Sequence, residues 1–169
     1  MQTIKNLAIR PLIKSIVWVF FSTSILFSPL DLLSQQAVAF DNHLSSLVEN
    51  ERAHLNELAF NEQTTAFVNS SGTIVVGTGT PTVIDVNAAD FSFIDFSSVS
   101  LLQVELIRIR VNTNEELTQA FNCSSAAGMN QLKCVLIVCS LEVSPSQLTN
   151  MVQGLQNNAT ACYSISVPK

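Results

Sequence analysis

The stretch KCVLIVCS, residues 133–140, decides the fold class of this chain. Four consecutive aliphatic residues stand between Cys134 and Cys139, and a short run that is apolar at every position is typical of a strand buried on both faces. If residues 132–143 form one strand, the two cysteines lie about 16 Å apart along it. Cysteines in a disulfide have Cα atoms no more than about 7 Å apart, so these two do not pair. Their odd spacing also sends the side chains to opposite faces.

The chain has four cysteines, an even number that predicts disulfides in an oxidising compartment. Two connectivities stay open. One joins Cys123 to Cys134 and Cys139 to Cys162, and it is preferred because the first bridge closes a small loop around 124–128. The other joins 123 to 139 and 134 to 162, which suits a parallel sheet with positions 134 and 162 near strand starts. Zinc and thiol-redox sites are disfavoured because the usual C-x-x-C pairs are missing.

The amino terminus predicts export. Residues 1–14 carry three basic residues and no acid, residues 15–27 are mostly apolar, and Ala37-Val38-Ala39 is a small-x-small pattern that signal peptidase accepts. We expect a cleavable signal peptide over 1–39, with Phe40 as the new terminus. A retained membrane anchor stays open as the alternative, although a span needs about 20 apolar residues. The basic leader ending in Ala-Val-Ala is typical of bacterial export, so the expected location is secreted or periplasmic.

The composition after cleavage limits the possible partners. Residues 40–169 keep five basic and twelve acidic residues. Binding to nucleic acid needs clustered Lys and Arg to neutralise phosphates, and the remaining five are scattered, so no nucleic-acid role and no stable membrane span after processing are expected. The partner is instead an unknown protein or small ligand. A chain of this length can form one domain with a sizeable core, so 40–169 is expected to be a single exported α+β domain.

The region after the leader predicts an amphipathic helix followed by strands. Asp41 or Asn42 can cap a helix of about five turns, whose apolar positions recur near the helical period: Leu44, Leu47, Val48, Leu55, Leu58 and Ala59. From 64 to 111, residues typical of strands alternate with turn signals, including GTGTP at 77–81. The candidate strands are 73–76, 82–86, 91–96 and 101–111, the last with a bulge near Leu106 where its apolar parity changes.

The carboxy-terminal part predicts alternating strands and short helices. Thr113 with Glu116, and Ser144 with Gln147, fit capping boxes in front of apolar residues, the second with a proline at the first helical position. Because each box follows a strand and precedes a loop with a cysteine, the two segments could be copies of one strand–helix unit. The predicted fold class is therefore α+β: an amino-terminal amphipathic helix, a β-rich middle and a carboxy-terminal β-α-β-α-β segment stapled by disulfides.

Histidine chemistry is weakly indicated. His43 and His54 share one face of the expected helix but lie about 16 Å apart along it, too far to share a metal. Glu51 and His54 have the Glu-x-x-His spacing of di-iron bundles, which however need two such motifs and further carboxylates. No G-x-S-x-G elbow is present. We therefore assign no catalytic, cofactor-binding or metal-ligating residue and interpret these side chains as a solvent-facing polar surface.

Other polar residues in the β-rich middle allow alternative interpretations. Asp85, Asn87, Asp90 and Asp95 carry oxygen ligands of the kind calcium takes, but not at the spacing of an EF-hand loop. Arg108 and Arg110 share one face of a strand; they could meet a carboxylate, although a solvated face is the more common arrangement. The phenylalanines at 91, 93 and 96 are expected in the core, although an exposed group would mark a partner site.

The sequence as a whole favours an exported, non-catalytic domain that binds, inhibits or belongs to the cell envelope, with an unknown ligand. The leader, the even number of cysteines and the scarcity of catalytic residue types support this hypothesis. The alternatives are an extracytoplasmic enzyme, either a hydrolase or a thiol oxidoreductase, and a subunit of a surface assembly that oligomerises through the β-rich segment.

Overall fold

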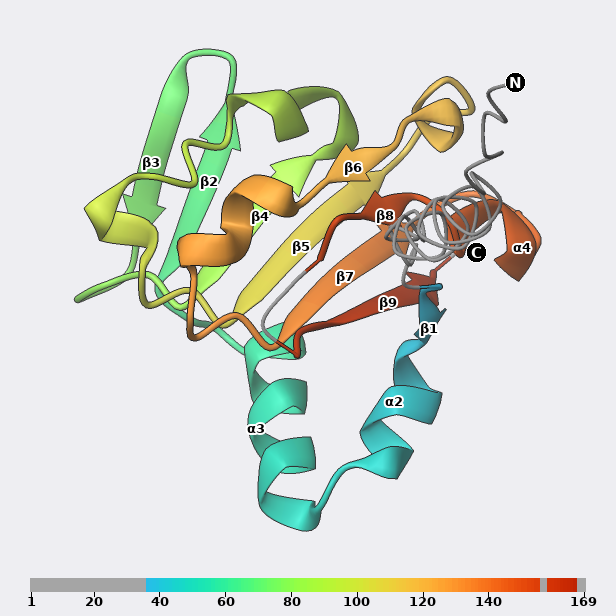
Figure 1. Ribbon diagram of the computed structural model, residues 1–169, viewed down its shortest axis with the longest axis horizontal. Helices are drawn as coiled ribbons and strands as arrows, with labels where there is room; N and C mark the ends of the chain where they lie inside the picture. The colour runs from blue at the N-terminus through green and yellow to red at the C-terminus, as the bar shows by residue number, and fades with distance from the viewer. Residues whose placement is uncertain (1–35, 156–157, 167–169) are drawn as a thin grey trace, which may run out of the picture. The chain divides into compact units, whose positions relative to one another are not determined.

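The computed structural model describes residues 36–155 and 158–166, and the part of the expected leader before residue 36 lies outside this range. The chain has a mixed α+β fold with a large sheet and few helices (Figure 1). The seven strands of the sheet lie in the order β1, β9, β7, β5, β4, β2, β3. Their bounds are β1 Val38–Ala39, β2 Thr65–Asn69, β3 Gly72–Val76, β4 Val83–Asn87, β5 Leu106–Val111, β7 Cys134–Cys139 and β9 Thr160–Ile165.

Within the described residues, every neighbouring pair of strands in this sheet is parallel except β2 with β3. β2 and β3 form a hairpin around Ser70 and Ser71. β4, β5, β7 and β9 lie side by side in chain order, so each is followed by a connector that returns the chain to the start of the next strand. The expected strand around 133–140 is confirmed as β7, which lies between β5 and β9.

The connectors cover one side of the sheet, which we call the connector face. Ile107, Ile109 and Ile137 point to this side and belong to a core that also includes connector residues such as Leu101 and Met129. The connectors contain short helices and two-residue strands instead of full helices. They are η1 Ala88–Phe93, η2 Val99–Leu101, η3 Glu116–Thr118, β6 Phe121–Asn122, η4 Ser124–Gly128, α4 Pro145–Leu148 and β8 Val152–Gln153.

The opposite side, which we call the helix face, is covered only in part. Helices α2, Phe40–Ser46, and α3, Glu49–Phe60, pack there in a second core with the first residues of several strands. Leu58 of α3 and Leu106 of β5 belong to this core, as do Cys134 and Cys162. Because parallel strands all begin at the same edge, the two helices cover that end of the helix face, toward β5, β7 and β9.

The expected single helix over 42–59 is corrected to two helices. The backbone is extended at Leu47 and Val48, which end α2 and precede α3. Leu47 still packs on the second core, whereas Val48 is 66% exposed. The apolar positions fit the period of one helix. The break instead divides them between two shorter helices, and both helices pack on the sheet.

The expected strand over 91–96 is wrong, because Ala88–Phe93 form the 3₁₀ helix η1. Phe91 is buried against Phe121, at 5.1 Å between ring centroids, while Phe93 is 51% exposed and does not fill the core. The strand expected over 101–111 begins only at Leu106. No bulge is needed to explain its change of parity, because the preceding apolar residues belong to η2 and its loop.

The two expected capping boxes form, although the helices behind them are short. The Glu116 carboxylate accepts hydrogen bonds from the backbone N–H of Asn112 and Thr113, but only η3 follows. Ser144 and Gln147 form the second box, in front of α4. The strands that follow, β6 and β8, pair with each other in parallel at equivalent places after the two boxes.

Candidate functional site

The uncovered half of the helix face carries a row of polar side chains across neighbouring strands. The register places Phe67 of β2 beside Asp85 of β4, and Asp85 beside Arg108 of β5. Arg110 follows two residues later on the same face of β5. Alternation along the strands sends the neighbouring residues to the connector face, so these four side chains point away from the larger core.

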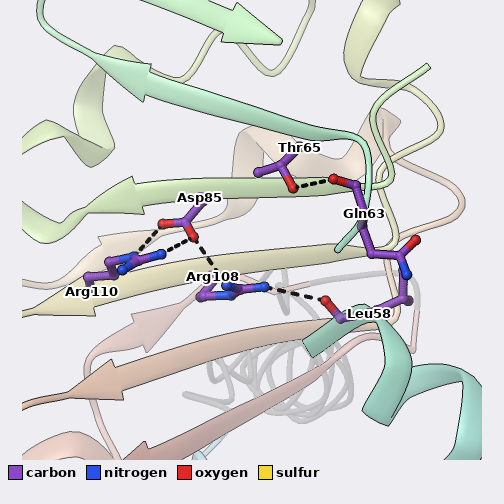
Figure 2. A network of polar contacts seen from close by, with 6 residues as sticks. All are labelled: Leu58, Gln63, Thr65, Asp85, Arg108 and Arg110. Atoms are coloured by element: carbon purple, nitrogen blue, oxygen red, sulfur yellow. Dashed lines mark hydrogen bonds and ion pairs between the residues drawn. The ribbon is translucent and has the colours of Figure 1, made fainter. Parts of the chain in front are cut away.

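Asp85 is the centre of this group, and its side chain is only 5% exposed. Arg110 donates two parallel hydrogen bonds to it, from Nε to Oδ1 and from Nη2 to Oδ2, each 2.6 Å long (Figure 2). Arg108 Nη1 donates a longer one of 3.3 Å to Oδ2. Paired hydrogen bonds between a guanidinium and a carboxylate fix both the position and the orientation of the groups. We call these three residues the Asp85 cluster.

Arg108 also connects the cluster to the end of α3. Its Nη2 donates to the backbone carbonyl of Leu58, in the last turn of the helix, at 3.4 Å (Figure 2). The carbonyls of a last turn have no partner within the helix and carry partial negative charge. The positively charged Arg108 guanidinium therefore stabilises this end of α3. The Arg108 Nε is buried without a hydrogen-bond partner. Burial is the main reason that the pKa of Arg108 is lowered from its ordinary value.

Arg110 is the most accessible member of the cluster. Its side chain is 47% exposed, against 20% for Arg108. The hydrogen bond to Asp85 raises the pKa of Arg110 above its ordinary value, so its charge is secure. Arg110 makes two donated hydrogen bonds, both to Asp85, and its Nη1 has no partner among the described residues. A guanidinium has five N–H donors, so Arg110 can still bind a second acceptor.

A cavity of about 560 Å³ opens beside the cluster. Asp85 and both arginines line one side, and Phe67 with Val76 give it an apolar wall. The rest of the lining is polar and includes the segment that follows α3, where Thr65 donates a hydrogen bond to the Gln63 carbonyl (Figure 2). Further lining residues are Asn61, Glu62, Thr64, Gly77 and Thr78. The expected turn at 77–81 therefore forms one wall of this cavity.

A second polar cluster joins the start of the sheet to α3. His54 Nε2 lies 2.8 Å from Oε2 of Glu105, and Lys133 Nζ lies 2.5 Å from the same oxygen. Burial raises the pKa of Glu105, but the contacts with Lys133 and His54 outweigh it and lower that pKa overall. The nearby cavity of about 360 Å³ includes Lys133 and His43 in its lining, but not His54 or Glu105. Among the described residues, no hydroxyl or thiol hydrogen-bonds to His54, whose partner is Glu105.

The other residues singled out in the sequence do not gather into a site. His43 has no contact with His54, and burial lowers its pKa. Asp85 is engaged by arginines, while Asp95 accepts hydrogen bonds from Ser97, which lower its pKa. Among the residues that the structure describes, no group of three or more His, Cys, Asp or Glu side chains could hold a metal. In the same part of the chain, no helix is long and apolar enough to cross a bilayer.

The four cysteines are buried, and all are free thiols, so the expected disulfide staples are not formed in this structure. Cys134 and Cys139 lie on opposite faces of β7, as their spacing predicts: Cys134 joins the core under the helices and Cys139 the core under the connectors. Cys162 lies in the same core as Cys134, and the neighbouring Cys162 thiol, together with burial, raises the pKa of Cys134. Cys123 lies in the same core as Cys139.

This arrangement bears on the two connectivities. The preferred pairing of Cys123 with Cys134 would cross the sheet, because these residues belong to different cores on its two faces. The other pairing joins residues that share a face. The positions of the side chains therefore favour the second pairing over the one that closes the small loop around 124–128.

The expected cleavage site lies at the edge of the sheet. Ala37 is buried, and its N–H donates to the Thr149 carbonyl. Val38 and Ala39 form β1 and pair with β9, while Phe40 begins α2 and packs in the core under the helices. Cleavage after Ala39 would thus remove β1 and leave β9 as the new edge strand.

The Asp85 cluster is the site that sequence reasoning left incomplete. The arginine pair was identified, but a solvated face was the favoured interpretation, and Asp85 was considered only as a calcium ligand. The available signal was the single acid inside the apolar strand Val83–Asn87, because a buried carboxylate needs a partner. Its position opposite Arg108 depends on the parallel register, which the sequence does not show.

No protein-family model, curated protein or solved structure matches this chain. The features that bear on function are therefore those of the site alone: a half-covered sheet face with a buried carboxylate, two arginines and an adjoining cavity.

Proposed function

We propose that this chain is an exported, non-catalytic binding domain, and that its ligand carries a carboxylate next to an apolar group. The observation that carries the proposal is Arg110 itself, which lines a cavity of about 560 Å³ and whose Nη1 has no hydrogen-bond partner among the described residues. Asp85 holds the guanidinium plane in place, so the outward nitrogen is oriented before a ligand arrives. A planar, oriented guanidinium is well suited to carboxylate recognition.

The composition of the cavity supports this ligand class. Two arginines stand against one carboxylate in the cluster, which leaves a positive balance that an anion can neutralise. Glu62 is the other charged residue of the lining; it brings the net charge of the whole lining to zero, but it is exposed and can be hydrated. Phe67 and Val76 provide apolar contact beside the charge, and pockets that bind small ligands combine such walls with a few polar groups.

Export and cleavage after Ala39 remain part of the proposal and are supported by the leader sequence. Mass determination of the exported protein checks this: the expected mature terminus is Phe40, and a chain that still begins at Met1 would contradict it.

We further propose that Cys134 and Cys162 become a disulfide after export, supported by their positions in one core on the neighbouring strands β7 and β9. The reaction is thiol–disulfide exchange with an extracytoplasmic oxidase. Its disulfide accepts two electrons and two protons and becomes a dithiol, while the two cysteine S–H bonds are replaced by one S–S bond. Peptide mapping without reductant is expected to find 134 linked to 162; a link between 123 and 134 would refute this pairing.

The binding proposal is tested with a matched pair of probes, N-acetylphenylalanine and its amide. The two differ only in the carboxylate, and both carry a ring that can contact Phe67. Titration followed by amide and Arg Nε–H chemical shifts is expected to show saturable changes for the acid at residues 63–67 and at Arg110. The amide is expected to bind at least about tenfold more weakly, since a hydrogen bond to a charged group contributes about 1.5–3 kcal/mol.

Two variants control for charge and folding. Arg110→Gln removes the proposed contact, and Arg52→Gln makes the same charge change on α3, at a residue that is ion-paired with Glu49 instead. Binding of the acid is expected to be lost only in the first. Equal binding of acid and amide, or equal loss in both variants, would refute the proposed site.

A further inference from the structure

Strand β3 is an unprotected edge of the large sheet. It pairs with β2 on one side and, within the described residues, has no neighbour on the other. In an antiparallel pair only alternate residues turn their backbone groups toward the partner strand, so the others point outward from β3. The opposite edge is β1, which is only two residues long and which the proposed cleavage would replace with β9. Natural proteins commonly keep edges short or place charges on them, and β3 has neither protection.

The side chains of β3 are apolar and accessible. Ile74, Val75 and Val76 are 60%, 44% and 55% exposed. The register places Ile74 beside Phe67, which is also exposed, so the apolar surface continues onto β2 on the helix face. β-branched residues at successive positions favour pairing with another strand. The surface formed by Phe67 and residues 74–76 is called the β3 edge below.

The charge distribution indicates what covers this edge. Residues 63–84 contain no Asp, Glu, Lys, Arg or His, although the chain has a net charge of −5. When two copies of an acidic chain meet, like charges face each other across most surfaces. An uncharged segment of 22 residues avoids this repulsion, whereas a basic or acidic partner would find no complementary charge on it.

We propose that β3 pairs with β3 of a second copy, antiparallel about a two-fold axis, so that the two sheets become continuous. Such an interface is self-complementary: a residue on one side of the centre contacts its counterpart from the other copy. The outward backbone groups of each strand would then be paired, and Ile74 and Val76 of both copies would meet on the helix face. This proposal does not depend on the identity of the ligand, although Phe67 and Val76 also line the cavity and the two cavities would lie on the same face of the joined sheet.

The test is sedimentation velocity on the mature chain, from micromolar to near-millimolar concentration, together with two variants. Ile74→Lys places like charges at the centre of the proposed pairing. Val99→Lys adds the same charge at another exposed apolar residue, in η2. We expect the wild-type mass to double with concentration, Val99→Lys to behave alike, and Ile74→Lys to associate at least about tenfold more weakly. Circular dichroism confirms that both variants are folded.

Amide hydrogen exchange separates edge pairing from association through another surface. Under conditions where the dimer forms, the outward-pointing amides within residues 72–76 are expected to become more protected, while those of α2 and α3 do not change. A wild-type chain that stays monomeric at the highest concentration would overturn the proposal and leave the edge to a different partner. A dimer that is unaffected by Ile74→Lys, or that protects other segments instead, would overturn it as well.

Discussion

The contacts of the Asp85 cluster predict that replacement of Asp85 with the nearly isosteric asparagine will destabilise the folded protein. In Asp85→Asn the shape of the residue is retained, but Arg108 and Arg110 lose the charge that both now contact. The mutation therefore leaves two guanidinium groups close together without an anion. β4 and β5 are neighbouring parallel strands in the middle of the sheet. The mutation is therefore expected to lower the free energy of unfolding of the whole domain and not only to loosen a terminal segment.

The expected magnitude follows from the burial of each member. Breaking a fully buried ion pair costs about 3–5 kcal/mol, and an exposed pair contributes about 0–1 kcal/mol. Asp85 is 5% exposed, but Arg110 is 47% exposed and can be hydrated. We therefore expect Asp85→Asn to lower the free energy of unfolding by about 2–3 kcal/mol. Arg110→Gln should cost about 1–2 kcal/mol, since Arg108 still contacts the carboxylate.

Urea unfolding of the wild type, both single variants and the double variant measures the coupling. If Asp85 and Arg110 interact as the 2.6 Å hydrogen bonds indicate, the double variant will cost about 1–2 kcal/mol less than the sum of the single variants. The slope of free energy against urea should stay constant. Additive effects, or a cost below about 0.5 kcal/mol for Asp85→Asn, would show that the cluster is a surface feature without structural consequence.

Three further predictions concern the core and the turns. With the cysteines reduced, burial raises the pKa of Cys123 from 9.0 to about 12, so the unfolded chain loses this proton first. The free energy of unfolding should be unchanged below pH 9 and fall by up to about 1.4 kcal/mol per pH unit between pH 9 and 12. Urea unfolding is expected to show a smaller fall in Cys123→Ala than in the wild type, and an equal fall in both would refute this. Gly77→Ala should cost at least about 1 kcal/mol more than Gly79→Ala in thermal unfolding, because both have positive φ but only the former Cβ meets Thr64, at 2.9 Å; equal melting temperatures would contradict it. Ile137→Ala should cost about 2–5 kcal/mol in urea unfolding, and a loss below about 1 kcal/mol would show that the β7 core is loosely packed.

The central strand could be predicted because its signal is local. Four aliphatic residues between two cysteines specify a strand that is buried on both faces, and the odd spacing of Cys134 and Cys139 gives their opposite directions. The Ser144 capping box was equally local and is present at the start of α4. Features that depend on a few neighbouring residues are visible in the sequence whatever the rest of the chain does.

The errors arose where tertiary packing outweighs local pattern. Residues 91–96 look like a strand by composition, but the chain must return across the connector face after β4, and a 3₁₀ helix with Phe91 in the core achieves this. The helix over 42–59 breaks at Val48 so that two short helices reach the sheet. Asp85 could not be paired with Arg110 from the sequence, because 25 residues separate them and only the parallel register brings them together.

The central claim is that Arg110, oriented by Asp85, is an anion receptor at the edge of the cavity. Determination of a crystal structure with N-acetylphenylalanine tests it directly. The account predicts the carboxylate within hydrogen-bond distance of Arg110 Nη1 and the ring against Phe67 and Val76. A ligand that binds instead in the cavity beside Lys133 and His43, or that leaves Arg110 uncontacted, would contradict it.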